Sequence, residues 1–110
     1  MKMLILLKSG PDTMEAERTM TTASDMVSQG HSVTLCLVQD AVHFCRGELQ
    51  SPVVSRLRTL IDKHLVVQAL LSDCSLRGIT PPSDTSCIAT GDYSSMVDLI
   101  ESADRTIGIL

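Results

Sequence analysis

The residue of this chain whose surroundings best suit chemistry is Cys74. It opens the segment Cys74–Ile79, just after the apolar, β-prone run Leu65–Leu71. The thiol is therefore expected where a buried strand emerges into a turn. Unpaired backbone N–H groups at the start of a helical turn favour a thiolate, and Arg77 can lie beside Cys74 on the same turn. The pattern predicts a thiol held in the thiolate form, which is the form that attacks sulfur.

The other three cysteines, Cys36, Cys45 and Cys87, form no C-x-x-C pair with one another or with Cys74, which argues against a zinc site. Cys36 lies inside an apolar run and is expected to be a small core residue. The roles of Cys45 and Cys87 stay open. His43 and Cys45 alone are too few ligands for a metal, so neither a metal nor an organic cofactor is expected.

Other polar residues offer weaker alternatives. Asp40 and His43 lie one turn apart and can orient one another, although an N-cap and a surface imidazole explain them equally well. The run Lys8-Ser9-Gly10 resembles a phosphate loop only superficially, since neither G-x-G-x-x-G nor G-x-x-x-x-G-K-[ST] is present. Nucleotide binding is therefore a minor hypothesis that rests on the fold class.

The composition limits the kinds of protein that this chain can be. A length of 110 residues with 44% apolar content fits a single domain over 1–110. A net charge of -4 without a basic run, together with one Phe and one Tyr, argues against nucleic acid as a direct partner. The apolar runs are too short to span a bilayer and no secretory signal follows Met1, so a cytoplasmic protein without a membrane partner is expected.

Strands and helices alternate along the chain. Apolar, β-prone runs predict four to five strands, at Met3–Leu7, Val33–Val38, Leu65–Leu71, Ser86–Ala89 and Thr106–Leu110. The first helix should begin at Asp12, with Glu15 completing a variant capping box, and end at Gly30. Pro52 suits the first turn of a second helix, and Asp92 caps a third. A short helical turn is expected over 39–47, with Asp40 as its cap.

This alternation predicts an α/β fold, a flavodoxin-like three-layer sandwich with a mainly parallel sheet. In the flavodoxin-like order the first and third strands are neighbours, and ligands bind beyond their carboxyl ends. Those ends carry Lys8-Ser9-Gly10 and Ser72-Asp73-Cys74. Lys8 would then add positive charge to a crevice at Cys74, which the backbones of Ser9, Gly10 and Gly78 would line.

Several short motifs, taken in order, resemble the DsrE/DsrF-like sulfur relay family. They are Ser-Gly-Pro-Asp at 9–12, Gly30–Leu35 followed by Gln39–Val42, the turn Cys74-x-x-Arg77-Gly78-Ile79, and Leu99-Ile100 before Ala103-Asp104-Arg105. The resemblance covers nearly the whole chain. It implies a TusD- or DsrE-type subunit, since only Cys74 falls at the position of the sulfur-carrying cysteine and the C-terminus lacks the cysteine of the DsrH or TusB branch.

The resemblance implies an intracellular sulfur carrier or sulfurtransferase that accepts sulfur from a donor protein and passes it on as a persulfide on Cys74. Arg77 and Lys8 would support the thiolate. Whether the sulfur serves oxidation or the thiolation of tRNA or a cofactor stays open. The alternative is a non-catalytic oligomeric module of the same fold that binds a small molecule or a protein.

The resemblance also implies assembly, as a homotrimer or hexamer or as a hetero-oligomer with related subunits. The segment Asp40–Pro52 carries Val42, Phe44 and Leu49 without a period typical of a long helix. These side chains are expected to pack against a neighbouring subunit rather than within the chain.

Overall fold

A five-stranded parallel sheet forms the centre of the computed structural model, which describes residues 1–46, 51–80, 88–108 and 110. In chain order the strands are β1 (Lys2–Leu7), β2 (Ser32–Leu37), β3 (Val66–Leu70), β4 (Ile88–Gly91) and β5 (Arg105–Ile107). The first three coincide with the predicted runs to within one residue at either end. The predicted fourth strand begins outside the described residues, and β5 ends earlier than predicted.

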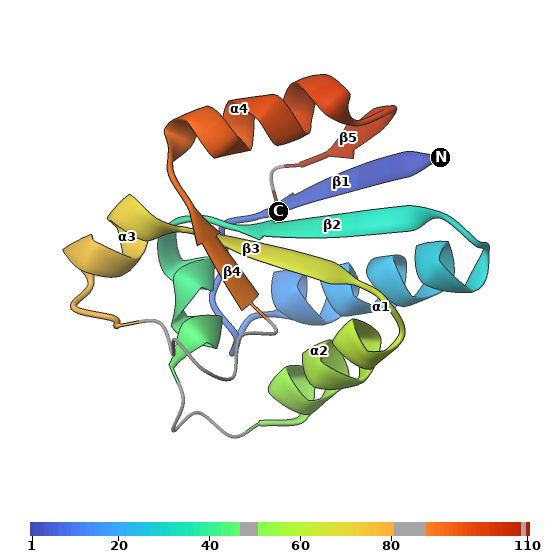
Figure 1. The fold of residues 1–110 in the computed structure, drawn as a ribbon. Coiled ribbons are helices and arrows are strands. Elements are labelled where there is room, and N and C mark those ends of the chain that lie inside the picture. The colour runs from blue at the N-terminus through green and yellow to red at the C-terminus, as the bar shows by residue number, and fades with distance from the viewer. Residues whose placement is uncertain (47–50, 81–87, 109) are drawn as a thin grey trace.

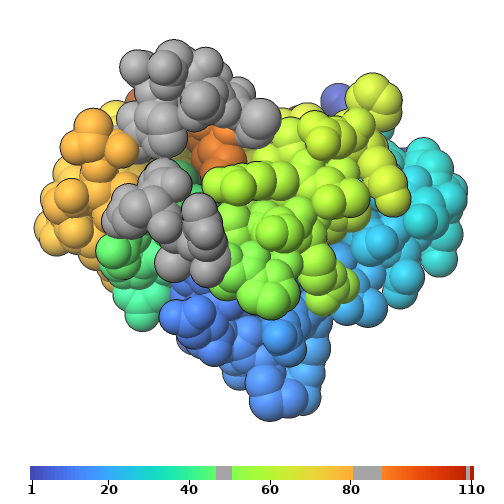
Figure 2. Space-filling view, turned by 90° about the horizontal axis from the view of Figure 1, so that it is seen from below, coloured from blue at the N-terminus to red at the C-terminus, as the bar shows by residue number. Residues whose placement is uncertain are grey.

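Helices cover both faces of this sheet (Figure 1). α1 (Met14–Ser28) and α2 (Pro52–Asp62) lie on one face, and α4 (Tyr93–Ser102) lies on the other. Figure 2 shows the first face from below, where α1 and α2 form much of the surface. The 3-10 helix η1 (Gln39–Cys45) and the short helix α3 (Leu71–Leu76) stand at the carboxyl ends of β2 and β3. This three-layer arrangement confirms the predicted α/β fold class.

The strand order is β4-β3-β2-β1-β5, so the prediction that the first and third strands are neighbours is wrong. β2 lies between them, with Leu35 paired to Ile5 on one side and to Val67 on the other. Each of the first three crossovers moves the chain one place in the same direction. The last crossover, through α4, returns it to the opposite edge and puts β5 beside β1. The ends of β1 and β3 are therefore separated by the end of β2.

Side-chain caps begin the three longer helices. Thr13, not the predicted Asp12, caps α1, because its Oγ1 accepts from the Ala16 N–H at 3.2 Å. Ser51 caps α2 and Asp92 caps α4, and both of these helix starts were predicted to within one residue. No helix in the described ranges is long and apolar enough to cross a membrane.

The main core lies between the sheet and the layer of α1 and α2. On β1, Ile5 and Leu7 face this layer, whereas Leu4 joins a smaller cluster under α4. Cys36 belongs to that smaller cluster, which confirms that it is a core residue. Burial raises the pKa of the Cys36 thiol from 9.0 to about 11, because the charged form would lose its hydration.

The side chains of η1 complete the main core from the carboxyl end of the sheet. Val42 is fully buried and Phe44 is 4% exposed, so the prediction that they cover a neighbouring subunit is wrong. A 3-10 helix has three residues per turn, which stacks Val42 above Cys45 and Ala41 above Phe44. All four side chains are buried. Leu49, the third residue assigned to that interface, lies outside the described residues.

Candidate functional site

Cys74 lies in α3, which begins at Leu71 immediately after the last residue of β3. The predicted position of the thiol, where a central strand gives way to a helical turn, is therefore confirmed. Cys74 is the fourth residue of this six-residue helix rather than its first, and its side chain is fully buried. The thiol thus belongs to the main core and points away from solvent.

The expectation that the site favours a thiolate is wrong, because the pKa of Cys74 is raised rather than lowered. Removal of the Cys74 thiol from water raises its pKa above 9.0, and this is the largest influence on the group. A hydrogen bond from Cys45 lowers the pKa, the Asp73 carboxylate raises it, and the Arg77 charge lowers it. The neighbours of Cys74 in sequence were identified, but local sequence does not show that the folded chain shields the sulfur from water.

The second thiol of the site is Cys45, the last residue of η1, which is 3% exposed. Its pKa rises from 9.0 to about 12 because of burial, the negative charge on an ionised Cys74 and the hydrogen bond to Cys74. The two ionisations are therefore coupled. A hydrogen bond from the protonated Cys45 to an ionised Cys74 lowers the pKa of Cys74 and raises that of Cys45.

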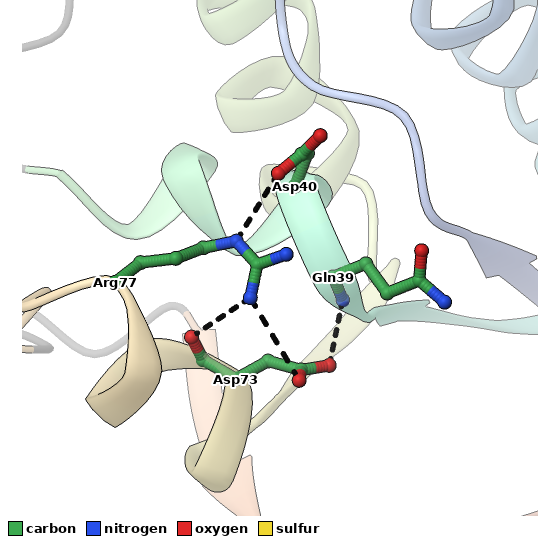
Figure 3. A network of polar contacts seen from close by, with 4 residues as sticks. All are labelled: Gln39, Asp40, Asp73 and Arg77. Carbon is green, nitrogen blue, oxygen red and sulfur yellow. Dashed lines mark hydrogen bonds and ion pairs between the residues drawn. The ribbon is translucent and has the colours of Figure 1, made fainter.

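A polar network joins α3 to η1 (Figure 3). The Arg77 Nε donates to Asp40 Oδ1 at 3.1 Å, and the Arg77 Nη1 donates to the Asp73 backbone oxygen at 3.3 Å. The buried Asp73 carboxylate accepts from the Gln39 backbone N–H at 2.7 Å. The guanidinium thus faces two carboxylates, since Asp73 Oδ1 is also 3.8 Å from Nη1. Arg77 chiefly fastens α3 to η1, and its effect on the thiol is secondary.

Asp40 therefore has a different role from either of the two considered from the sequence. No side chain caps η1, and the Asp40 carboxylate pairs with Arg77 rather than with His43. His43 keeps a buried Nδ1 that has no hydrogen-bond partner in the described part of the chain. No group of three metal-ligating side chains occurs in these described ranges.

Gly78 ends α3 and fixes the backbone at Cys74. Its φ of +66° is a left-handed conformation, which glycine adopts at little cost. The Ile79 N–H donates to the Cys74 carbonyl at 2.9 Å, and the Gly78 N–H donates to the Ser75 carbonyl at 3.2 Å. This pair of bonds is a Schellman motif, so the glycine predicted to line a crevice is the C-terminal cap of the cysteine's own helix.

The loop after β1 reaches the site only through η1. The Lys8 carbonyl accepts from the Ala41 N–H at 3.2 Å, while the Lys8 side chain is exposed. The charged side chains that shift the pKa of Cys74 are Asp73 and Arg77. Gly10 packs against Asp40, and the Ser9 hydroxyl donates to the Leu110 carbonyl at 2.8 Å. Lys8 was placed by the wrong strand order, because β2 separates the two strand ends.

An open pocket of about 590 Å³ lies on the outer side of α3. Its lining is mostly apolar and comes from α3 and the start of α4, namely Leu71, Ser72, Ser75, Leu76, Asp92 and Tyr93. The pocket stands beyond the carboxyl ends of β3 and β4, the end of a parallel sheet where ligands usually bind. Cys74 is absent from this lining, since its side chain faces the core.

Comparisons with known proteins identify the fold. No family model matches the sequence. No curated protein sequence matches it significantly either. Among solved structures, the crystal structure of the YchN protein from E. coli matches with a TM-score of 0.82 and 17% sequence identity, covering 98% of this chain and 97% of that one. A likeness at this identity establishes the fold, and it supports the DsrE-like resemblance at the level of the fold.

Proposed function

We propose that the protein carries sulfur as a persulfide on Cys74. The observation on which this proposal rests is the position of Cys74, which lies at the carboxyl end of a central strand and in the same core cluster as a second thiol, Cys45. The hydrogen bond from Cys45 stabilises charge on the Cys74 sulfur, so the charge needed for attack forms there. The fold shared with the YchN protein and the position of Cys74 in its turn support the same function.

The transfer needs no bound cofactor. The Cys74 thiolate attacks the terminal sulfur of a donor persulfide, the S–S bond of the donor breaks, and the donor leaves as a thiolate. The product is Cys74–S–SH, whose outer sulfur is then open to attack by an acceptor thiolate. The number of S–S bonds is unchanged at each step, so sulfur moves without an external oxidant or reductant.

The burial of Cys74 requires that α3 move away from η1 when a donor binds. A six-residue helix is too short to be stable alone, so α3 keeps its position through contacts with its neighbours. One of those contacts is the ion pair between Arg77 and Asp40, whose carboxylate side chain is 68% exposed. A pair so exposed stabilises by only about 0.2–1 kcal/mol, which a docking donor protein can readily replace.

Intact mass spectrometry tests this function. Early in an incubation with inorganic polysulfide at mildly alkaline pH, the wild type and the Cys36→Ala variant should each gain the mass of at least one sulfur atom. Cys74→Ser should gain none at this position, as shown by peptide mapping. Sulfur on another cysteine, or no adduct on folded wild type even early in the incubation, would refute the assignment of Cys74.

The pocket beside α3 supports a second candidate, the non-catalytic binding module. Its apolar lining includes Tyr93 and Leu76, which are 65% and 80% exposed, so an apolar small molecule or peptide side chain could be held there. Titration with a fluorescent apolar probe, compared between wild type and Tyr93→Ala, tests this candidate. It replaces the first if the probe binds in the pocket while Cys74 takes up no sulfur.

A further inference from the structure

We propose that Cys45 is a second catalytic residue, the thiol that resolves the Cys74 persulfide. It attacks the Cys74 sulfur, releases the carried sulfur as hydrogen sulfide and leaves a Cys45–Cys74 disulfide. This inference rests on the proposed function, because Cys45 acts only after Cys74 has accepted sulfur. Sequence reasoning left the role of Cys45 open, and its place in the same core cluster as Cys74 is apparent only in the fold.

The geometry brings the two thiols together and keeps other groups away. The Cys45 and Cys74 side chains both belong to the main core, and they are 3% and 0% exposed. Their interaction also raises the pKa of Cys45. They come from different elements, the last residue of η1 and the fourth residue of α3. Water is excluded from this core, and Cys36 lies in the separate cluster under α4, so among the described cysteines Cys45 is the one that shares the core cluster of Cys74.

Polar contacts fasten the two elements at the start of η1. Arg77 joins α3 to η1 through Asp40, and Asp73 joins the start of η1 through the Gln39 N–H. The Cys74 carbonyl is held in turn by the Ile79 N–H at 2.9 Å. Disulfide formation requires the two sulfur atoms to approach to about 2.05 Å. Rotation of the two short side chains, together with a small shift of the end of η1, supplies this approach.

The site of attack follows from the position of Cys45. In the persulfide Cys74–S–SH, the inner sulfur is the Cys74 Sγ, which interacts with Cys45 before loading, and the outer sulfur extends beyond it. Attack at the inner sulfur breaks the S–S bond of the persulfide and forms the Cys45–Cys74 bond. The proton of the Cys45 thiol goes to the departing hydrosulfide, which leaves as hydrogen sulfide.

The electrons also balance. The carried sulfur is reduced to sulfide, and the two cysteines are together oxidised to one disulfide. A cellular thiol or dithiol reductant is needed to return the pair to two thiols. The loaded protein therefore has two fates, transfer of sulfur to an acceptor thiol or release of sulfide, and Cys45 provides the second when no acceptor is bound.

The test follows loaded protein over time. Wild type, Cys45→Ala and the control Cys36→Ala are incubated with inorganic polysulfide, freed of excess reagent, and examined by intact mass, peptide mapping and a sulfide assay. Wild type and Cys36→Ala should release about one sulfide per chain, lose the added sulfur and show Cys45 linked to Cys74. Cys45→Ala should retain the persulfide, and circular dichroism confirms that this variant is folded.

The outcomes separate this inference from the function on which it rests. If neither wild type nor Cys45→Ala ever carries extra sulfur or a Cys45–Cys74 bond, sulfur carriage itself fails. If both load and keep their persulfide equally long, Cys74 is a carrier and the role of Cys45 is refuted. The peptide map of loaded wild type decides the point without any variant, since a disulfide joining other cysteines also overturns the proposal.

Discussion

At the scale of single residues, Cys74 combines a reactive position with an environment that keeps it neutral. Burial raises its pKa, while Cys45 and Arg77 partly oppose the rise and Asp73 adds to it. Sequence alone placed Cys74 and Arg77 on one turn, because both lie in a short continuous segment. It did not identify Cys45, because contact between residues of different elements depends on how η1 packs beneath α3.

Limited alkylation should show both the reactive position of Cys74 and its raised pKa. Among the described cysteines, Cys74 should be modified first, and its rate should still be rising with pH above 9.0, since its pKa lies above that value. Iodoacetamide labelling over a pH series with peptide mapping measures this. Faster labelling of Cys45, or a rate that levels off near pH 8, would contradict the predicted ionisation of the pair.

Replacing Asp40 with Ala should speed alkylation of Cys74 by roughly two- to fivefold at neutral pH, as expected for loss of an exposed ion pair. The change removes one of the two polar links between α3 and η1 and also the negative charge that Arg77 faces at Asp40, so both effects act in the same direction. Asp98→Ala, which removes an exposed aspartate from α4, is the matched control. Equal rates for the two variants would show that the ion pair does not restrict access.

The buried Cys36 predicts a loss of stability in alkali. Its pKa is about 11 in the folded chain and an ordinary 9.0 in the unfolded chain. The contribution of the neutral thiol to the free energy of unfolding is therefore fully present below pH 9 and is lost as the pH rises through 11. Urea unfolding at pH 8 and pH 10 should show that the free energy of unfolding falls by about 1 kcal/mol less in Cys36→Ala than in wild type over this interval. An identical loss in both proteins would mean that the thiol ionises without cost when folded.

At the scale of elements, continuous apolar runs were sufficient to predict β1, β2 and β3. The burial of η1 was missed because its apolar residues recur every third position, a spacing that suits a 3-10 helix rather than a long α-helix. The strand order was missed for a different reason. The length and composition of α4 do not indicate which edge of the sheet the next strand, β5, will join.

The C-terminal ends of the helices give a stability prediction at this scale. α1 and α3 end at Gly30 and Gly78, whereas the equivalent position after α2 is His64, with a φ of +78°. A side chain with a Cβ in this conformation is strained, so His64→Gly should raise the free energy of unfolding by about 0.5–1 kcal/mol. His64→Ala keeps the strain and should give no such gain in urea unfolding. A loss of stability in the glycine variant would contradict this explanation.

At the scale of the whole molecule, apolar side chains remain exposed on the face of the sheet that α4 covers. Tyr93, Val97 and Ile100 of α4 are 65%, 50% and 43% exposed. We propose these three side chains, in place of the buried Val42 and Phe44, as the interface of the homo-oligomer expected from the sequence. An interface there would adjoin the pocket beside α3, because Tyr93 belongs to both surfaces.

Light scattering at micromolar concentration should therefore give the mass of a trimer or hexamer. Val97→Glu should lower that mass, because a carboxylate in an apolar interface would lose its hydration. Met14→Glu changes a residue that is 63% exposed on α1, at the opposite face, and should leave the assembly intact. A monomeric wild type would disprove self-association, and dissociation by Met14→Glu instead would place the interface on the other face.

The pairing of β5 with β1 also determines the order in which the chain can assemble during synthesis. Of the five strands described, β1 is made first and β5 last, yet Lys2 and Asp104 are joined by two hydrogen bonds at 2.7 and 2.8 Å. Contacts so distant in sequence close late and slow folding. On the ribosome, strands β1 to β4 can pair as they emerge, while the outer edge of β1 stays unpaired until β5 is made. Until then that edge is open to pairing with another nascent chain.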